Sequence, residues 1–259
     1  WCVPCRDEAQ GFSQVARDLV ARRPDVVHLP QQMQFASLLK RAVPGVKVVV
    51  HLHQDELAKL DIELLRRDLL DVDAVATVSE FVTLGARARL PEMAARIHTV
   101  GNGVDVAYYS EAEPTSPTAE RRDILFVGSM DYHANIEAAL EFAGDVWPAM
   151  RDAHPDFRFV IVGRNPPQQI RDLAAQPGVV VTGTVDDVRP WYRSAFAVVV
   201  PLRTGSGTRL KILEAMAAGV PVISTRLGAE GLNIQDGGNI LLAETAAEMR
   251  QAADLLAKS

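Results

Sequence analysis

The chain has 259 residues, enough for one large domain or two of ordinary size. Hydrophobic residues make up 48% and charged residues 23%, which is the composition of a globular protein with a buried core rather than of a disordered or fibrous chain. The 33 acidic residues outnumber the 27 basic ones, and a net charge of −6 argues against a nucleic-acid-binding protein. We find no apolar run long enough to span a bilayer and no signal peptide in the sequence.

Both cysteines, Cys2 and Cys5, lie at the start of the sequence and are separated by two residues. This spacing is typical of the redox motif of thioredoxin-like proteins, where a helix N-terminus lowers the pKa of one thiol. In those proteins the motif follows a strand, whereas the residues around Cys2 and the region after Pro24 indicate a different arrangement. We therefore favour a reduced pair in a cytosolic protein and keep a redox role as a minor alternative.

Strands and helices alternate through the first part of the chain. Apolar, β-branched runs predict strands at residues 25–29, 46–52, 74–78 and 96–100. Helical periodicity predicts helices at residues 32–42, 56–70 and 80–90. The strand at 46–52 is nearly all apolar, as expected when both faces of a parallel sheet are covered.

A polar, proline-containing stretch at residues 111–120 reads as a linker, and a second alternating series follows it. Its strands are expected at residues 124–127, 157–162, 179–182, 195–200, 220–224 and 240–242, and its clearest helices at 136–142 and 208–218. Such alternation produces parallel sheets with right-handed crossovers. The sequence therefore predicts an α/β protein of two doubly wound, Rossmann-like domains that face a cleft.

The most informative segment lies between the strands at 195–200 and 220–224. A loop with Gly205 and Gly207 leads into an amphipathic helix whose first turn is expected to carry Arg209 and Lys211. In open α/β sheets, ligands bind at the carboxyl ends of the strands, where such a loop lies. A helix N-terminus has free N–H groups and a partial positive charge, and two added cations make it a site for a dense anion. A nucleoside diphosphate is the favoured ligand.

Glycines also mark the ends of other strands in this series. Gly128, Gly163 and Gly183 each end a predicted strand. Ordinary turn chemistry is the alternative explanation for any one of them, because glycine allows unusual dihedral angles. Several glycines at the same sheet edge favour a ligand that lies across that edge.

Four segments of the second series resemble, in order and spacing, the donor-binding half of retaining GT-B glycosyltransferases of family four (group 1), in particular the sugar transferases associated with exopolysaccharide export. These segments are residues 125–130, 159–164, 181–188 and 205–221. The first series resembles the acceptor half more loosely, through residues 23–28, 51–53, 73–79 and 102–105. The resemblance begins near Pro24 and implies that the amino-terminal strands of the family are missing.

The resemblance implies three parts: an incomplete acceptor-side domain at residues 1–106, a linker at 107–122 and a nucleotide-sugar donor-binding domain at 123–259. It further implies an enzyme that transfers a sugar from a nucleotide-diphosphate donor to an acceptor hydroxyl, with retention of configuration, in polysaccharide or glycolipid synthesis. The acceptor would be a glycan or a lipid-linked molecule, and no metal, cofactor or nucleic acid is expected. The implied location is cytoplasmic, with contact at the inner face of the cell membrane left open.

The resemblance also assigns roles around the departing diphosphate, whose charge positioned cations and backbone N–H groups stabilise. Arg209 and Lys211 suit this catalytic role, since arginine binds phosphate in a bidentate manner. The alternative is a basic turn on a solvated helix, which the helix dipole disfavours. Where the family commonly has an arginine and a lysine, this sequence has Ser129 and a residue near His133, and we hypothesise that Arg209 and Lys211 replace the lost charge. The other residues expected around the donor phosphates and sugar are Gly128, Ser129, Gly205, Ser206, Gly207 and Thr208.

Glu214 matches the second glutamate of the family's two-glutamate motif, which binds the donor ribose. The first glutamate would fall at Ser206 and is absent, which puts sugar recognition in doubt. The alternative for Glu214 is an (i, i+3) ion pair with Lys211.

Two further places are expected to meet the nucleotide. Gly183, Thr184 and Val185 match the backbone stretch that contacts the base. Arg164 is expected over the base or a phosphate, with an exposed loop arginine as the equally supported alternative.

In the acceptor half, His53 follows a buried strand and matches a family histidine that faces the donor sugar. A neutral imidazole there would orient a hydroxyl or the reacting sugar, and His51 would point to the same side. A metal site and a structural histidine are the alternatives. At the level of the whole chain, the alternative to an enzyme is a nucleotide-sugar binding module without turnover.

Overall fold

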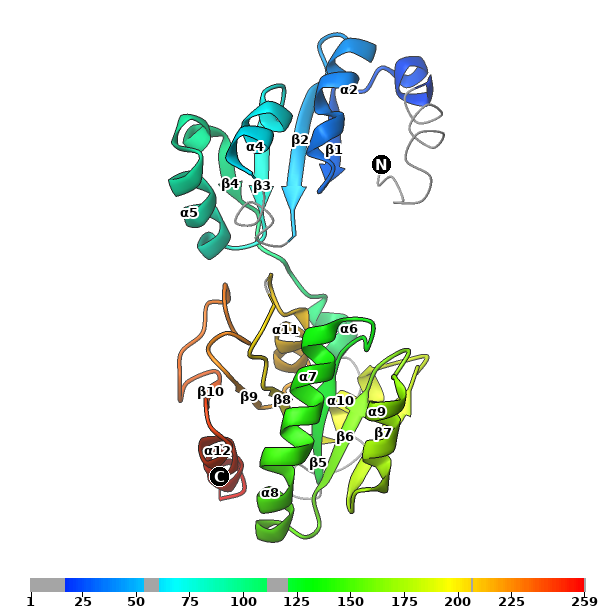
Figure 1. Cartoon of the computed structure of the whole chain (residues 1–259), viewed down its shortest axis with the longest axis vertical. Coiled ribbons are helices and arrows are strands. Elements are labelled where there is room, and N and C mark those ends of the chain that lie inside the picture. The colour runs from blue at the N-terminus through cyan, green and yellow to red at the C-terminus, as the bar shows by residue number, and fades with distance from the viewer. Residues whose placement is uncertain (1–16, 54–60, 111–120, 206, 259) are drawn as a thin grey trace. The chain divides into compact units, whose positions relative to one another are not determined.

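The computed structural model describes residues 17–53, 61–110, 121–205 and 207–258. The chain divides into two compact units, Trp1–Asn102 with Ser206–Thr208, and Gly103–Gly205 with Arg209–Ser259. Each unit is built on a parallel sheet (Figure 1). Cys2, Cys5 and Ser206 lie outside the described residues.

The first unit contains a four-stranded sheet in the order β1-β2-β3-β4. Every neighbouring pair is parallel, as the alternating pattern predicts. The strands are β1 (Val26–Pro30), β2 (Lys47–Leu52), β3 (Ala74–Thr77) and β4 (Ile97–Thr99). Alternate residues of β2, Val48, Val50 and Leu52, are fully buried and form the centre of the core.

Two helices of the first unit begin where short polar side chains cap them. Asp61 accepts hydrogen bonds from the backbone N–H groups of Glu63 and Leu64, and Ser79 caps the helix that follows β3. The described part of the helix predicted at residues 56–70 therefore starts only at Ile62. The helices are α2 (Ala36–Ala42), α4 (Ile62–Leu69) and α5 (Glu80–Arg89), with 3-10 turns at Met33–Phe35 and Pro91–Arg96.

The second unit contains a six-stranded sheet in the order β10-β9-β8-β5-β6-β7, again parallel throughout. The chain leaves β5 toward β6 and β7, then returns to β8 on the other side of β5. The order therefore reverses between β5 and β8, which is the place where doubly wound sheets bind ligands. The strands are β5 (Asp123–Val127), β6 (Arg158–Val162), β7 (Val179–Gly183), β8 (Ala195–Val200), β9 (Val222–Ser224) and β10 (Leu241–Leu242).

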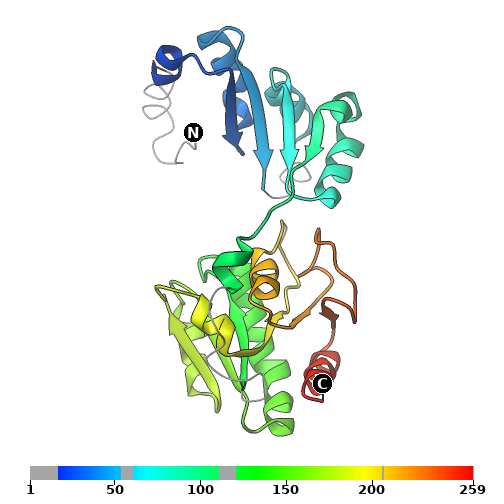
Figure 2. The same ribbon diagram turned by 180° about the vertical axis from the view of Figure 1, so that it is seen from behind.

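Helices cover both faces of this sheet. In Figure 1, α7, α8 and α9 lie in front of the sheet, and in Figure 2 the reversed view brings α10 and α11 to the front. All six residues of β8 are buried, which explains why its sequence is an unbroken apolar run. The helices are α6 (Val106–Ser110), α7 (His133–Glu141), α8 (Trp147–Ala153), α9 (Gln168–Arg171), α10 (Arg189–Ser194), α11 (Leu210–Ala217) and α12 (Ala246–Leu256).

Three local predictions differ from the structure. The helix predicted at 136–142 begins three residues earlier and runs into a π-helical turn, Phe142–Val146. The helix predicted at 208–218 begins at Leu210, because Gly207 has a φ of 90° and Arg209 is not helical. Residues 106–110, most of which the sequence predicts as linker, form α6 of the second unit, where the rings of Tyr109 and Tyr192 lie 5.9 Å apart.

Candidate functional site

The predicted donor-site residues of the second unit lie where its central strands end. The backbone N–H of Gly128, after β5, donates to the carbonyl of Val162, and that of Gly163, after β6, donates to the carbonyl of Gly183. These bonds are 3.0 and 3.3 Å long and run across three adjacent strands. The three glycines therefore meet at one sheet edge, as the sequence predicts.

The structure gives physical reasons for these glycines. A Cβ atom at Gly163 would overlap the carbonyl oxygen of Gly128, so the two loops can approach only because residue 163 has no side chain. Gly183 has a φ of 72°, a conformation that side chains rarely adopt. Packing and turn chemistry thus account for both residues, and a substrate contact at either one stays a prediction.

The loop after β8 folds back against the loop after β5. Gly205 has a φ of 99°, and a Cβ there would lie 2.6 Å from the hydroxyl oxygen of Tyr132 and 3.2 Å from Nη2 of Arg209. Thr204 also donates a hydrogen bond of 2.9 Å to Glu137 on α7. Glycine at position 205 therefore lets Tyr132 and Arg209 lie directly against the backbone of this loop.

Arg209 is the N-cap residue of α11 rather than part of its first turn, with φ −86° and ψ 87°. Its side chain is only 8% exposed. Burial lowers the pKa of the guanidinium, against the opposing effects of Tyr132 and Glu230. A buried arginine at a helix N-terminus is costly by itself, and a bound anion would offset that cost.

Lys211 lies in the first turn of α11, as predicted. Its Nζ donates a hydrogen bond of 2.9 Å to Oδ1 of Asn135 and lies 4.7 Å from the ring centre of Phe126. Burial, and secondarily the charge of Arg209, lower the pKa of this ammonium to about 7, while Glu214 acts in the opposite direction. The alternative of a solvated basic turn is therefore wrong for both cations.

Thr208, which precedes Arg209, carries another polar group of this loop. Its hydroxyl oxygen is buried and has no hydrogen-bond partner in the described part of the chain. Buried hydroxyl groups normally bind a partner, and a missing partner indicates a place for an unseen water or ligand. Gly207, next to it, has a φ of 90° and keeps side-chain bulk away from the same loop.

Glu214 does not form the ion pair considered as its alternative role. Its Oε2 accepts a hydrogen bond of 2.8 Å from the hydroxyl of the fully buried Tyr192. Tyr109, from α6, lies against Tyr192, with ring centres 5.9 Å apart, and the charge of Glu214 also acts on its hydroxyl. Burial, followed by the negative charge of Glu214, raises the pKa of Tyr109 to about 12 and raises that of Tyr192 as well. Both hydroxyls therefore remain donors, and ribose binding by Glu214 stays a prediction.

The loops after β5 and β6 are joined by a small polar network. Arg164 lies within 3.1 Å of the Ser129 hydroxyl and forms an ion pair with Asp131. The pKa of Asp131 is lowered, first by a hydrogen bond from Asn165 and then by one from Ser129. The structure thus brings together Arg164 and Ser129, two of the predicted substrate-binding residues, although the guanidinium remains largely exposed.

The remaining donor-site prediction concerns the segment after β7. Thr184 is exposed, whereas Val185 is partly buried against the core of the unit. Because β7 is the edge strand of the sheet, Gly183 and Thr184 keep backbone groups that face no further strand. Their predicted contact with the base stays a prediction.

In the first unit, His53 follows β2 and is exposed. Its ring lies 4.4 Å from that of His51, which in turn lies 5.3 Å from the ring of His28 on β1. Burial, then the charges of His53 and His28, lower the pKa of His51. Among the described residues, no three His, Cys, Asp or Glu side chains are arranged to hold a metal ion.

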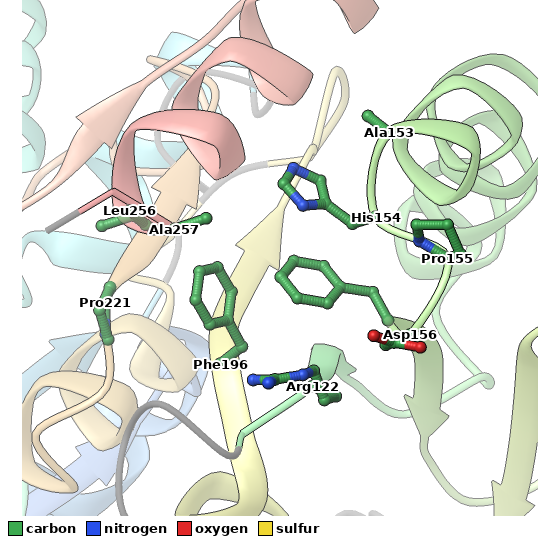
Figure 3. A pocket seen from close by; sticks show the side chains of 10 residues that line it. Arg122, Ala153, His154, Pro155, Asp156, Phe196, Pro221, Leu256 and Ala257 are labelled. Carbon is green, nitrogen blue, oxygen red and sulfur yellow. The ribbon is translucent and has the colours of Figure 1, made fainter.

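A separate pocket of about 700 Å³ lies at the opposite, amino-terminal edge of the second sheet. Figure 3 shows the side chains of Arg122, His154 and Phe196 around it. Arg122 precedes β5, and Phe196 is the second residue of β8. None of the predicted donor-site residues lines this pocket, so it is distinct from the site described above.

Sequence reasoning missed four residues of the site: Tyr109, Tyr132, Asn135 and Tyr192. Asn135 was missed because the helix that carries it was placed too late in the sequence. The start of α7 is hard to recognise in the sequence, because its N-cap residue, Tyr132, makes no side-chain capping hydrogen bond. The available clue was that Asn135 is a polar residue on the apolar side of the helical pattern, which indicates a buried hydrogen-bonding role. Asn135 is only 7% exposed.

The fold of this chain is found in other solved structures. S. aureus TarM superposes with a TM-score of 0.75 over 95% of this chain and 52% of its own, at 16% identity. Anabaena HepE in complex with UDP and glucose gives a TM-score of 0.68 over 97% of this chain and 72% of its own, also at 16% identity. These similarities establish the GT-B fold, which the sequence predicts.

Sequence relatives point to the same group. YtcC of Bacillus subtilis is 27% identical over 84% of this chain, and the phosphatidyl-myo-inositol mannosyltransferase of Mycolicibacterium smegmatis is 29% identical over 82%. The chain spans 59% and 56% of the lengths of these two relatives.

Family profiles match both halves of the sequence. The profile of the group 1 glycosyl transferases matches residues 121–259, and that of glycosyltransferase family 4 matches residues 5–108. The first of these alone covers more than half of the chain. The chain therefore belongs to the group 1 glycosyltransferases of family 4.

Proposed function

We propose that this chain transfers a sugar from a nucleotide-diphosphate donor to the hydroxyl of a glycan or lipid-linked acceptor. The observation that carries the proposal is the pair of cations at the start of α11, the buried Arg209 and the partly buried Lys211. Two like charges two residues apart at a helix start repel each other and are costly to desolvate. A diphosphate would relieve both costs, and its binding energy would become available for stabilising the departing group.

The sheet topology supports the same conclusion. The cations lie at the carboxyl edge between β5 and β8, where the strand order reverses. In this proposal Arg209 and Lys211 bind the diphosphate, the loop containing Gly205 and Thr208 supplies backbone and hydroxyl groups, and Glu214 binds the ribose. Retention of configuration, and His53 as the group that faces the sugar, are further parts of the proposal.

The acceptor is proposed on the basis of relatives. One relative is named a phosphatidyl-myo-inositol mannosyltransferase and another a D-inositol 3-phosphate glycosyltransferase. We therefore propose glycolipid or polysaccharide synthesis, without a metal or cofactor, at the cytoplasmic face of the membrane. No helix of the described residues has the length and apolarity needed to cross a membrane. Sedimentation with vesicles of anionic phospholipid, compared with neutral vesicles, tests peripheral contact.

Titration calorimetry of the chain with UDP, GDP and ADP tests the proposal, followed by a sugar-release and transfer assay with the corresponding nucleotide sugars. We expect one nucleoside diphosphate to bind at micromolar concentration and its sugar to be transferred or slowly hydrolysed. Arg151→Ala, on the surface of α8, serves as a control that keeps binding. Binding without any sugar release would support the alternative of a binding module, and binding of none of the nucleotides would contradict both.

A further inference from the structure

The ammonium of Lys211 is held by one residue that no part of the proposed function assigns. Oδ1 of Asn135, on α7, accepts its hydrogen bond at 2.9 Å, and Nδ2 of Asn135 donates to the carbonyl of Ser129 at 2.8 Å. The amide orientation follows from chemistry, because an ammonium and a carbonyl can be satisfied together only if the oxygen faces Lys211. Asn135 therefore connects the lysine on α11 to the loop after β5.

The backbone of Gly128 completes this arrangement. A Cβ at residue 128 would lie 2.8 Å from Cγ of Asn135 and 2.9 Å from Nζ of Lys211, closer than carbon side chains approach such atoms. The ring of Phe126 lies on another side of the ammonium, with its centre 4.7 Å away. Amide, ring and glycine backbone thus fix where the charge of Lys211 can lie.

The nature of the group at position 135 determines how much charge remains for a ligand. A neutral amide orients the ammonium without neutralising it, whereas a carboxylate at the same place would compensate it within the protein. The charged groups that act on Lys211 are Arg209, which disfavours its protonation, and Glu214, which favours it. From β5 and α7 it meets uncharged groups, Phe126 and Asn135.

We propose that Asn135 is a positioning residue of the donor site, whose amide holds the Lys211 ammonium at the Gly128 backbone without neutralising it, ready for the diphosphate. The inference rests on the proposed function. It predicts that diphosphate binding above pH 7 is coupled to proton uptake by Lys211. The Asn135 amide fixes the position of the Lys211 ammonium, and the diphosphate provides the negative charge that stabilises the protonated form of Lys211.

The test compares the full chain with Asn135→Ala and Asn135→Asp by calorimetric titration of the best-bound nucleoside diphosphate between pH 7 and 9. We expect the wild-type affinity to fall as the pH rises across this range, and Asn135→Ala to lower affinity at pH 7 about tenfold, the cost of one charge-assisted hydrogen bond. Asn135→Asp should lower affinity too, but with a flatter pH dependence, because its carboxylate keeps Lys211 protonated. This flattening of the pH dependence in Asn135→Asp would not follow from a merely structural role.

Gln176→Ala is the matched control, since it removes an amide at the amino-terminal end of β7, on the opposite edge of the same sheet. It should change neither affinity nor pH dependence. If Asn135→Ala does not fold, as judged by its circular dichroism, the affinity and pH dependence of the isosteric Asn135→Asp variant test the inference. Wild-type affinity and pH profile in the folded variants would overturn the inference while leaving the proposed function intact. A wild-type chain that binds no nucleoside diphosphate would instead overturn the proposed function, and the inference with it.

Discussion

The hydroxyl of Tyr192 donates a hydrogen bond of 2.8 Å to Oε2 of Glu214, and the ring of a second tyrosine, Tyr109, packs edge-on against Tyr192 at 5.9 Å between ring centres. Tyr192 comes from α10 and Glu214 from α11, so a helix that precedes β8 fixes the orientation of a glutamate on the helix that follows it. A carboxylate has about four acceptor positions, which leaves capacity for ribose hydroxyls. Glu214 is thus oriented by the protein and still able to accept from a ligand.

The role of Glu214 is tested with the best-bound nucleoside diphosphate and its 2′-deoxy analogue. If Glu214 accepts from the ribose, the wild-type chain should prefer the ribose form roughly tenfold, and Glu214→Gln should lose most of that preference. Tyr192→Phe should reduce it severalfold, because the carboxylate loses one orienting donor. Equal preference in the wild type and in Glu214→Gln, measured by calorimetry, would show that Glu214 is structural.

Removing the guanidinium of Arg209 should weaken nucleoside diphosphate binding sharply. We expect Arg209→Ala to lose at least about tenfold in affinity, and Arg209→Lys to recover only part of it, since lysine cannot bind phosphate in a bidentate manner. Arg151→Ala, which breaks a surface pair with Asp152, is the matched control and should bind normally. Unchanged affinity in a folded Arg209→Ala variant would remove Arg209 from the site.

Gly163 is expected to be intolerant of any side chain. In Gly163→Ala the new methyl group would overlap the carbonyl oxygen of Gly128, and overpacking of this kind costs about 1–3 kcal/mol or more. We expect the thermal midpoint of the second unit to fall by about 5 °C or more. Gly144→Ala is the control, because a Cβ there meets no atom within 4 Å and a helical position favours alanine. A Gly163→Ala variant as stable as Gly144→Ala would contradict the packing described here.

The stability of the first unit should depend on pH through His51. Burial and the neighbouring rings of His53 and His28 lower the pKa of His51 in the folded state below its ordinary value of 6.5. Between the lowered value and 6.5 the unfolded chain binds more protons, so the free energy of unfolding rises with pH in that window. This contribution is fully present above 6.5 and is lost as the pH falls.

Proton NMR titration of the imidazole C–H resonances measures this effect directly. We expect a pKa for His51 below that of an exposed histidine, and a higher value in His28→Gln, because one neighbouring positive charge is removed. His98→Gln, at an exposed position of β4, should leave the titration of His51 unchanged. An ordinary pKa for His51 in the wild type would contradict the cluster.

Much of the fold could be predicted from the sequence because its signals are local. The β-branched runs define the strands of both sheets, and the predicted strand boundaries lie within about two residues of those observed. Short polar caps such as Ser79 mark the starts of helices. The N-cap of α7 is Tyr132, which makes no side-chain capping hydrogen bond, and the predicted start of α7 is three residues late. The glycines at strand ends and the cations after Gly207 were likewise visible without coordinates.

The sequence by itself thus determined the alternating α/β pattern, the family resemblance and the placement of Arg209 and Lys211 after a strand. Only the tertiary structure decided what surrounds them. Lys211 and Asn135 are 76 residues apart, and they meet because α7 and α11 follow the adjacent strands β5 and β8. Strand order is set by the packing of the whole sheet rather than by local preference, so neither the amide partner of Lys211 nor Tyr192 as the partner of Glu214 follows from the residues next to them in sequence.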